Sequence, residues 1–344
     1  MCTGILVRAQ NGAIVRGRTM EWGSSDIYSR IFAIARQKEM FGTLPDGSNG
    51  CTWKGKYGFV AIDAFNQFFA SDGINEKGLT CGLFYHPGTA KYESYDQSKA
   101  ATSMAASDLG TYMLSNFATV AEVKEGVSAL HLVGIPLPGT NVDVPCHYLV
   151  ADPSGKALVI EFLNGKMTLF DNPVGVITNS PAFDWHMTNL RNYLHFTAEG
   201  NLIGKYAGVE LAPIGHGAGL LGVPGDFTPP SRFVRAAAFV STARPTADAA
   251  DAVLETARIM DSFNLPIEPA TSPQERQLQK GLLSSTTWTT ISDLSSLKFY
   301  YHTQFDRRLR CVDLKKLDFS PGKEYVPKPL DKIRKQAIED VTFP

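Results

Sequence analysis

The sequence predicts an α+β fold in which antiparallel sheets and helices occur in separate groups. Three observations indicate this class. Strand-like runs fill most of the first 100 residues, helical patterns begin at Ser103, and strand-like runs return after residue 146 and again near the C-terminal end. The regular strand–helix alternation of a Rossmann-type fold does not fit this order, and no G-x-x-x-x-G-K-[ST] loop occurs. We therefore expect no nucleotide cofactor.

The N-terminal strands are short and are separated by residues that favour turns. Asn11-Gly12 lies between two apolar runs and is a strong signal for a tight hairpin. A second turn-like segment, residues 75–78, leads into a later run. The expected strands span residues 5–9, 13–16, 57–62 and 79–85.

Helices are expected where capping residues precede an apolar pattern. Asp108 could cap a helix that continues to residue 117. Thr119 followed by Glu122 forms a capping-box pattern before a short helix that ends near Gly126. Later in the chain, helices are expected at residues 232–241 and 247–263, the second with Thr246 as its N-cap.

The remaining elements are strands around one long loop. Turn chemistry at residues 152–155 and at Asn164-Gly165 divides a meander. Residues 204–230 are rich in glycine and proline and predict a long structured loop. The expected strands span residues 147–151, 157–163, 167–170, 174–178, 288–293, 298–303 and 310–313.

Composition excludes several classes of function. The chain has 344 residues, 19% of them charged, and a formal net charge of −1, so neither nucleic acid nor an anionic membrane is an expected partner. No apolar run approaches the ~18 residues of a membrane span. The sequence after Met1 enters a strand-like run directly, without a basic and apolar leader. The protein is therefore expected in the cytoplasm, or in the periplasm or medium if a leader has been removed.

Cys2 differs from the other cysteines by its position. The five cysteines form no C-x-x-C pair and are odd in number, so neither a zinc site nor a complete disulfide framework is indicated. The four that we expect to be small buried hydrophobic residues are Cys51, Cys81, Cys146 and Cys311. Removal of Met1, which a small second residue permits, would make Cys2 the N-terminal residue.

A mature Cys2 would carry a thiol and a free α-amine on one residue. Free thiols have a pKa of about 8.5 and α-amines of about 7.7–8.0, so the amine can take the thiol proton at neutral pH, directly or through a water. This is an activated nucleophile that requires no catalytic histidine. The alternative is that Cys2 is an incidental residue at a frayed terminus.

Arg18 and Glu21 favour the catalytic interpretation. The hairpin predicted by Asn11-Gly12 folds the second strand back along the first, which brings both residues close to Cys2. A guanidinium beside Cys2 would stabilise a thiolate. The alternative is a surface ion pair between Arg18 and Glu21, which would contribute little to stability.

Six short motifs in one order give the chain a family resemblance. They are Met1-Cys2-Thr3, Gly17-Arg18-Thr19-Met20-Glu21-Trp22, Asn75-Glu76-Lys77-Gly78-Leu79, Thr178-Asn179-Ser180-Pro181, Gly225-Asp226-Phe227 before Ser231-Arg232-Phe233, and Trp288-Thr289-Thr290. Together they resemble the choloylglycine hydrolase family, which contains conjugated bile salt hydrolases and penicillin V acylases. The resemblance runs from residue 2 to about residue 313. It implies one domain over residues 1–344, with 314–344 as a C-terminal extension.

The resemblance also implies a fold, an assembly and roles for residues. The fold would be that of an N-terminal nucleophile hydrolase, an αββα sandwich of two antiparallel sheets between helix layers, assembled as a homotetramer. Cys2 would be nucleophile and base, Arg18 would tune the thiolate, and Arg232 would order the charged network. The side-chain amide of Asn179 and the backbone N–H of Tyr85 would bind the oxyanion. The family has asparagine at the position of Tyr85 in bile salt hydrolases and tyrosine in penicillin V acylases.

Two departures from the family pattern affect the branch assignment. Glu21 stands where the family more often has aspartate, and its carboxylate is expected to hydrogen-bond the amine of Cys2. The segment after Asn192 is expected to be short and to lack the extended loop that links subunits in Gram-positive members. Together with Trp22, this resembles the Gram-negative branch, whose members often carry an export leader and include enzymes similar to acyl-homoserine lactone acylases.

The expected substrate is a small molecule with a hydrophobic acyl group joined by an amide to a small polar amine. Trp22, Phe59, Phe65 and Tyr85 are candidates for the acyl pocket, although a core position is the favoured interpretation for the two phenylalanines. Tyr85 and the short segment favour penicillin V and acyl-homoserine lactones over bile salt conjugates.

Two other classes remain open from the sequence. A non-enzymatic relative could use the same pocket for binding. Glu21 and retention of Met1 would support this, because a blocked amine cannot act as a base. A metal-dependent amidase is a further alternative. The seven histidines show no H-E-x-x-H or H-x-H spacing, so we expect them to be structural and expect no metal.

Overall fold

The computed structural model describes residues 1–22, 27–136, 144–200, 203–265, 285–336 and 338–343. Two antiparallel sheets form its body. The first has the order β1 (Cys2–Arg8), β2 (Ile14–Trp22), β16 (Ser285–Asp293), β17 (Lys298–Thr303) and β18 (Arg310–Asp313). The second has the order β13 (Lys166–Asp171), β12 (Ala157–Leu163), β11 (Cys146–Ala151), β8 (Thr80–Tyr85), β7 (Gln67–Asn75), β6 (Phe59–Ala64), β3 (Arg30–Ile34) and β19 (Lys328–Pro329).

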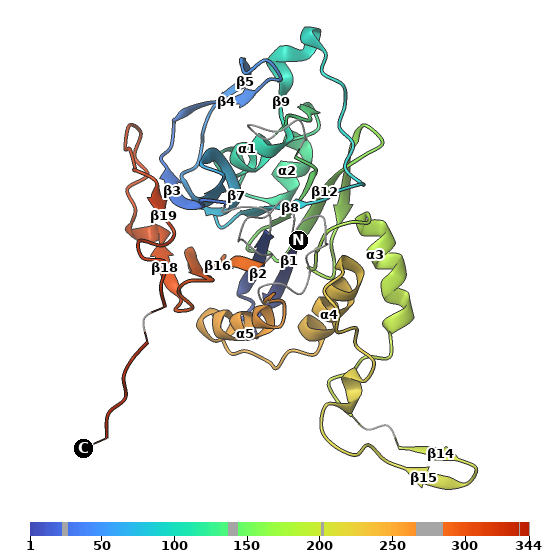
Figure 1. Cartoon of the computed structure of the whole chain (residues 1–344). Coiled ribbons are helices and arrows are strands. Elements are labelled where there is room, and N and C mark those ends of the chain that lie inside the picture. The colour runs from blue at the N-terminus through green and yellow to red at the C-terminus, as the bar shows by residue number, and fades with distance from the viewer. Residues whose placement is uncertain (23–26, 137–143, 201–202, 266–284, 337, 344) are drawn as a thin grey trace, which may run out of the picture.

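Helices cover the outer faces of both sheets, so the layers run α, β, β, α (Figure 1). On the side of the eight-stranded sheet lie α1 (Leu109–Asn116) and α2 (Val120–Gly126), and α1 contacts β7 and β8. On the side of the five-stranded sheet lie α4 (Pro229–Ser241) and α5 (Ala249–Asp261), which contact β1, β2 and β16. Beside α4 runs α3 (Phe183–Leu190). The predicted α+β class and its four layers are confirmed.

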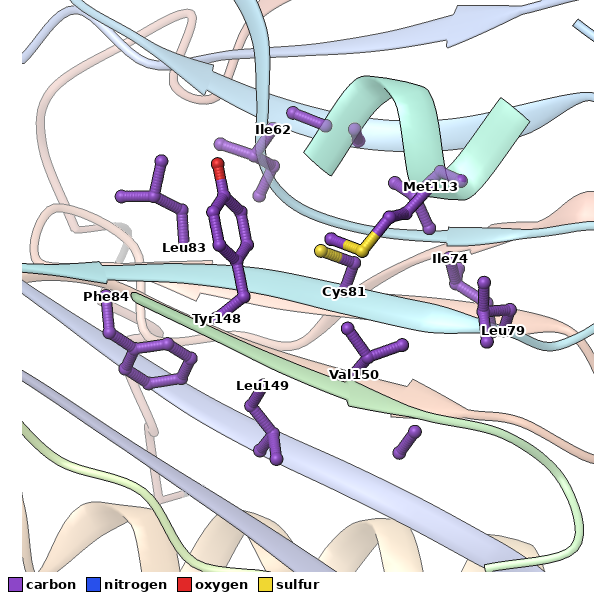
Figure 2. Close-up of a cluster of buried hydrophobic side chains, with 14 of the residues drawn as sticks. Ile62, Ile74, Leu79, Cys81, Leu83, Phe84, Met113, Tyr148, Leu149 and Val150 are labelled. Carbon is purple, nitrogen blue, oxygen red and sulfur yellow. The ribbon is translucent and has the colours of Figure 1, made fainter. Parts of the chain in front are cut away.

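The central strands are buried on both faces, because one face meets helices and the other meets the second sheet. Figure 2 shows Cys81 of β8 beside Met113 of α1 and Leu83 on the same side of the strand, while Phe84 points to the opposite face. Each of these side chains is at most 6% exposed. The alternation of strand side chains thus fills two apolar layers from one strand.

The shorter elements lie around the two sheets. They are the pair β4 (Glu39–Thr43) and β5 (Asn49–Lys54), the parallel pair β9 (Ser103–Ala105) and β10 (His131–Val133), the hairpin β14 (Gly204–Tyr206) and β15 (Val209–Leu211), and 3₁₀ turns at Gln97–Thr102, Ala106–Asp108, Arg191–Tyr193, Ala218–Leu220 and Leu314–Lys316. Within the described residues, no helix is both long and apolar enough to cross a bilayer.

The turn residues placed most strands correctly. Asn11-Gly12 closes the β1–β2 hairpin, with Gly12 at φ +86°. Thr119 caps α2 by accepting a hydrogen bond from the N–H of Glu122 at 3.2 Å, as expected. Asp108 precedes α1 but makes no capping bond, because its carboxylate accepts from the N–H of Thr43 instead.

Several expected elements differ from the structure. The strand expected at residues 13–16 continues to Trp22 as β2. Residues 174–178 form no strand but a single bridge from Ile177 to Gly4, because Pro173 and the positive φ of Gly175 interrupt the extended run. The N-cap of α5 is Asp248 and not Thr246, since Asp248 accepts from the N–H of Asp251. The start of α4 lies at Pro229, three residues before the expected position, because prolines are compatible with the first helical turn.

The segment after Asn192 is not short, so that expectation is wrong. Part of the expected loop at 204–230 forms the hairpin of β14 and β15, which projects away from the body of the molecule (Figure 1). The side chains of Tyr206 and Val209 on this hairpin are 77% and 60% exposed. The projecting hairpin removes one of the two arguments for the Gram-negative branch. Residues 217–222 spell G-x-G-x-x-G, but they lie on this segment and not between a strand and a helix of a parallel sheet.

Two of the four cysteines expected in the core are not buried. Cys81 and Cys146 are fully buried, as predicted, and burial raises the pKa of both thiols. Cys51 is half-buried and Cys311 is exposed, because both lie on strands at the margin of the fold, β5 and β18. The expectation for these two residues is wrong.

Candidate functional site

The register of the β1–β2 hairpin determines where Cys2 points. Cys2 lies opposite Met20, and Gly4 lies opposite Arg18, so the side chains of Cys2, Met20 and Arg18 share one face of the sheet. This face is the one that meets the eight-stranded sheet. Arg18 Nη2 lies 3.5 Å from Cys2 Sγ, and Met20 Sδ lies 3.6 Å from it. The thiol is thus held between the sheets, and Cys2 is only 1% exposed.

Arg18 is anchored by the opposite sheet. Its Nη1 donates to the carbonyl of Ser71 on β7 at 2.8 Å, and its Nη2 donates to the carbonyl of Leu83 on β8 at 2.6 Å. The guanidinium carbon lies 5.0 Å from the ring centroid of Phe84 and 4.6 Å from that of Trp288. Two carbonyls and two aromatic faces therefore fix the guanidinium beside the sulfur.

The ionised side chains next to Cys2 carry a net positive charge. Asp72 Oδ1 lies 2.6 Å from Arg16 Nη1 and 3.8 Å from Arg18 Nη1, and all three side chains are at most 1% exposed. Asp72 Oδ2 also accepts from the hydroxyl of Thr290. One carboxylate facing two guanidinium groups leaves an excess of one positive charge in a buried place, which is costly. A thiolate on Cys2 would neutralise it.

Asn179 and Arg232 enclose the backbone of Cys2. Asn179 Oδ1 accepts from the N–H of Cys2 at 2.9 Å and from Arg232 Nη2 at 2.6 Å. Asn179 Nδ2 donates one hydrogen to the carbonyl of Tyr85 at 2.6 Å, which leaves its second hydrogen for another acceptor. Arg232, in the first turn of α4, also donates to the carbonyl of Cys2 and to Thr3 Oγ1. Burial lowers the pKa of Arg232.

Glu21 lies on the opposite face of β2 from the thiol. Its backbone pairs with Met1 through two hydrogen bonds of 2.9 Å. Its Oε1 accepts from the hydroxyl of Thr286, whereas its buried Oε2 has no hydrogen-bond partner within the described part of the chain. Burial raises the pKa of this carboxyl, and the N-terminal ammonium and Arg232 oppose that rise. With Met1 attached, the nitrogen of Cys2 donates to Asn179 and not to the expected Glu21.

Three of the four predicted pocket aromatics lie together. The ring of Trp22 packs edge-on against Phe65, with centroids 5.2 Å apart, and against Tyr85, with centroids 5.8 Å apart. The Tyr85 carbonyl bonded to Asn179 links this cluster to the site. Phe59 is fully buried and packs against Phe32, so it lies in the core and not in this cluster.

A cavity of about 340 Å³ adjoins the aromatic cluster. Trp22 and Trp288 are among the residues that line it, together with Asn66, Thr287 and Phe305. Cys2 does not line it. The cavity therefore reaches Trp22 and Trp288. The Cys2 sulfur is buried in this chain, which still carries Met1.

A cluster of buried acid–base groups that no sequence motif indicates lies beside Asn179. His86 and His147 stack with ring centroids 4.0 Å apart, and both lie near the carboxyl of Glu161. His186 adds a third imidazole, which bonds the carbonyl of Asn179. These residues come from four different segments of the chain, and no motif joins them.

The chain matches one protein family and is similar to two kinds of enzyme in it. Residues 2–327 match the family of linear amide C–N hydrolases called the choloylglycine hydrolase family. A bile salt hydrolase/transferase from Clostridium perfringens (strain 13 / Type A) is 30% identical over 333 residues, which cover 94% of this chain and 96% of that protein. A penicillin V acylase from Pectobacterium atrosepticum is 26% identical over 89% of this chain and 78% of that protein.

Solved structures of the same two kinds share the architecture. The C2A mutant of conjugated bile acid hydrolase from Clostridium perfringens superposes with a TM-score of 0.82 at 26% identity, over 99% of this chain and 100% of that one. Penicillin V acylase from Agrobacterium tumefaciens superposes with a TM-score of 0.75 over 94% of this chain and 89% of that one. Its 22% identity supports a shared fold alone.

Proposed function

Since this chain belongs to the choloylglycine hydrolase family and is an amide hydrolase with the αββα fold of N-terminal nucleophile hydrolases, we propose that Cys2 is its nucleophile. Its substrate would be an amide between a hydrophobic acyl group and a small polar amine. The observation that carries the proposal is the position of Cys2, with Arg18 Nη2 3.5 Å from its sulfur and Asn179 Oδ1 2.9 Å from its nitrogen.

The reaction would begin with removal of Met1, which frees the amine of Cys2. The amine takes the thiol proton, and the thiolate attacks the substrate carbonyl carbon. The second hydrogen on Asn179 Nδ2 and the backbone N–H of Tyr85 donate to the oxyanion. The ammonium then returns its proton to the leaving nitrogen as the C–N bond breaks. In the second step the amine takes a proton from water, whose oxygen attacks the thioester carbon. The C–S bond then breaks, the acid leaves, and the sulfur takes the proton back from the ammonium.

The neighbouring charges would support each step. Arg18 and the charge excess beside Asp72 stabilise the thiolate, and Arg232 holds Asn179 and the Cys2 carbonyl in place. Glu21 would face the ammonium that forms on mature Cys2, because its buried Oε2 lacks a partner within the described residues and accepts hydrogen bonds when ionised.

The preferred substrate class is the phenoxyacyl type represented by penicillin V. The flat rings of Trp22, Phe65 and Tyr85 next to Asn179 would pack against an aromatic acyl group. Conjugated bile salts are the second candidate, favoured by the 30% identity with the Clostridium perfringens enzyme. Initial rates on penicillin V, glycine-conjugated bile salt and an acyl-homoserine lactone would decide the order, and a preference for the conjugate would reverse it.

The projecting β14–β15 hairpin supports the proposed homotetramer. Its exposed Tyr206 and Val209 suit burial against another copy of this chain. Light scattering on the Tyr206→Ser, Val209→Ser double variant should give a smaller particle than the wild type. An unchanged mass would remove the hairpin from the assembly.

The Cys2→Ala variant tests the nucleophile. It should fold as the wild type does but show no turnover, because no other group near the amide site replaces the sulfur. Cys81→Ala is the matched control, since that thiol is fully buried on β8. Retained hydrolysis by Cys2→Ala would refute the proposal and favour another nucleophile. A wild-type protein that binds the substrates without hydrolysing them would indicate a binding relative.

A further inference from the structure

Three buried histidines bond the backbone of the loop that carries Asn179. His147 Nε2 lies 3.2 Å from the carbonyl of Thr178, His186 Nε2 lies 2.8 Å from that of Asn179, and His86 Nε2 lies 3.4 Å from that of Pro181. Each imidazole is at most 2% exposed. Such a row of donors along one short loop fixes the direction of its backbone.

The protonation of these groups follows from their partners. A carbonyl only accepts, so each Nε2 must carry a hydrogen. The buried Nδ1 atoms of His86 and His186 have no hydrogen-bond partner among the described residues, which suits neutral rings with unprotonated Nδ1. Burial lowers the pKa of His86 and of His147 to about 3 and also lowers that of His186. All three rings are therefore neutral donors at physiological pH.

Glu161 completes this arrangement. Its Oε1 lies 3.0 Å from Nδ1 of His147, and both of its oxygens accept from the N–H of Phe183 at 3.1 Å. Because His147 Nε2–H is committed to Thr178, the proton between the pair must come from the carboxyl. The pKa of Glu161 is raised, mainly by burial, which favours the protonated carboxyl that this bond requires.

The same atoms are poorly arranged for a metal ion. His86, His147 and Glu161 offer ligand atoms within 4.8 Å of one another, but the two rings stack at an angle of only 7°. The nitrogen lone pairs lie in the ring planes, so those of two parallel rings cannot converge on one ion. The cluster is better suited to holding backbone than to coordination.

We propose that His186, supported by His147 and Glu161, is a positioning residue that orients Asn179 for oxyanion binding. The inference rests on the proposed function, because it gives Asn179 that role. His186 bonds the carbonyl of Asn179 itself, while its ring stacks on Phe233 of α4 at 4.7 Å. The network acts on the backbone of Asn179, and Arg232 and Tyr85 act on its side chain.

The variant His186→Phe tests this role with little other change, because it keeps the stacked ring and removes one hydrogen bond. We expect kcat to fall by about tenfold or more, since small errors in placing a catalytic group are costly, with KM within about twofold. His186→Gln, whose amide can donate near the Nε2 position, should recover most of kcat. Ser180→Ala is the matched control on the same loop, because the Ser180 hydroxyl bonds the carbonyl of Pro87 instead.

A double-mutant cycle separates positioning from a general structural effect. In an Asn179→Asp background, His186→Phe should cause no further loss of kcat, because the group it positions has been removed. Equal losses in both backgrounds, or wild-type kcat in His186→Phe, would refute the inference. If Asn179→Asp alone keeps wild-type kcat, the oxyanion role that the proposed function gives to Asn179 fails instead. Should His186→Phe not fold by circular dichroism, His186→Leu takes its place in the same cycle.

Discussion

Replacing Asn179 by aspartate should separate its role as an oxyanion donor from its role as a hydrogen-bond acceptor for Cys2 and Arg232. Aspartate keeps the oxygen that accepts from the N–H of Cys2 at 2.9 Å and from Arg232 at 2.6 Å. It replaces the Nδ2 donor by an oxygen that faces the Tyr85 carbonyl, which now lies 2.6 Å from Nδ2. The variant therefore loses its donor while its acceptor contacts remain.

The expected loss is large for catalysis and smaller for stability. Removing one oxyanion donor lowers kcat by about 10²–10³, or about 2.7–4 kcal/mol. Asn179→Ala should lose activity to the same degree and also stability, because it leaves the N–H of Cys2 and Arg232 Nη2 buried without their acceptor. Each such group costs about 1–3 kcal/mol. The alanine variant should thus be as inactive as the aspartate variant but less stable.

Two assays decide the matter. Single-turnover hydrolysis of an N-acyl amide gives the rate of the chemical step, and urea denaturation gives the free energy of unfolding of each variant. A folded Asn179→Asp enzyme within about tenfold of the wild-type rate would refute the oxyanion role of Asn179.

Three further changes test the fold. Gly82→Ala would place a Cβ atom 2.0 Å from Arg16 Nη2 and 2.6 Å from Asp72 Oδ1. Urea denaturation should therefore show a free energy of unfolding lower by about 1–3 kcal/mol. An unchanged midpoint would mean that the buried ion pair can move aside. Asp248→Ala removes the N-cap of α5 and should cost about 1 kcal/mol, which Asp248→Asn should largely restore in thermal unfolding. Burial lowers the pKa of His302 to about 4, so as pH falls below about 6.5 the unfolded chain takes up a proton that the folded chain excludes, and stability is lost. Between pH 7 and pH 5, His302→Gln should therefore lose about 2 kcal/mol less stability than the wild type, and equal losses would contradict this assignment.

Turn chemistry made much of the fold predictable from sequence. Asn11-Gly12 fixed the hairpin whose register brings Arg18 to the sulfur of Cys2. The strand β7 was missed because its central Asp72 and Gly73 resemble a turn. In the folded chain that carboxylate faces two buried arginines, a tertiary reason for its presence that no local pattern reveals.

The residues of the candidate site could be predicted only where a family motif or a short hairpin indicated their positions. Asn179 and Arg232 came from the family motifs, and the structure brings both to the backbone of Cys2. His186 and Glu161 were not predicted. His186 lies only seven residues after Asn179, but no motif indicates its bond to that carbonyl. Glu161 of β12 meets the N–H of Phe183 only in the folded chain. A buried histidine has no spacing signal that separates it from an ordinary core residue.

Intact mass of active enzyme, quenched with acid during turnover of a slow N-acyl amide, tests the role of Cys2 most directly. We predict a chain that lacks Met1, together with a second species heavier by the acyl group, whose adduct maps to Cys2. Full activity in protein that retains Met1, or an acyl group attached to another residue, would contradict a nucleophile that carries its own base.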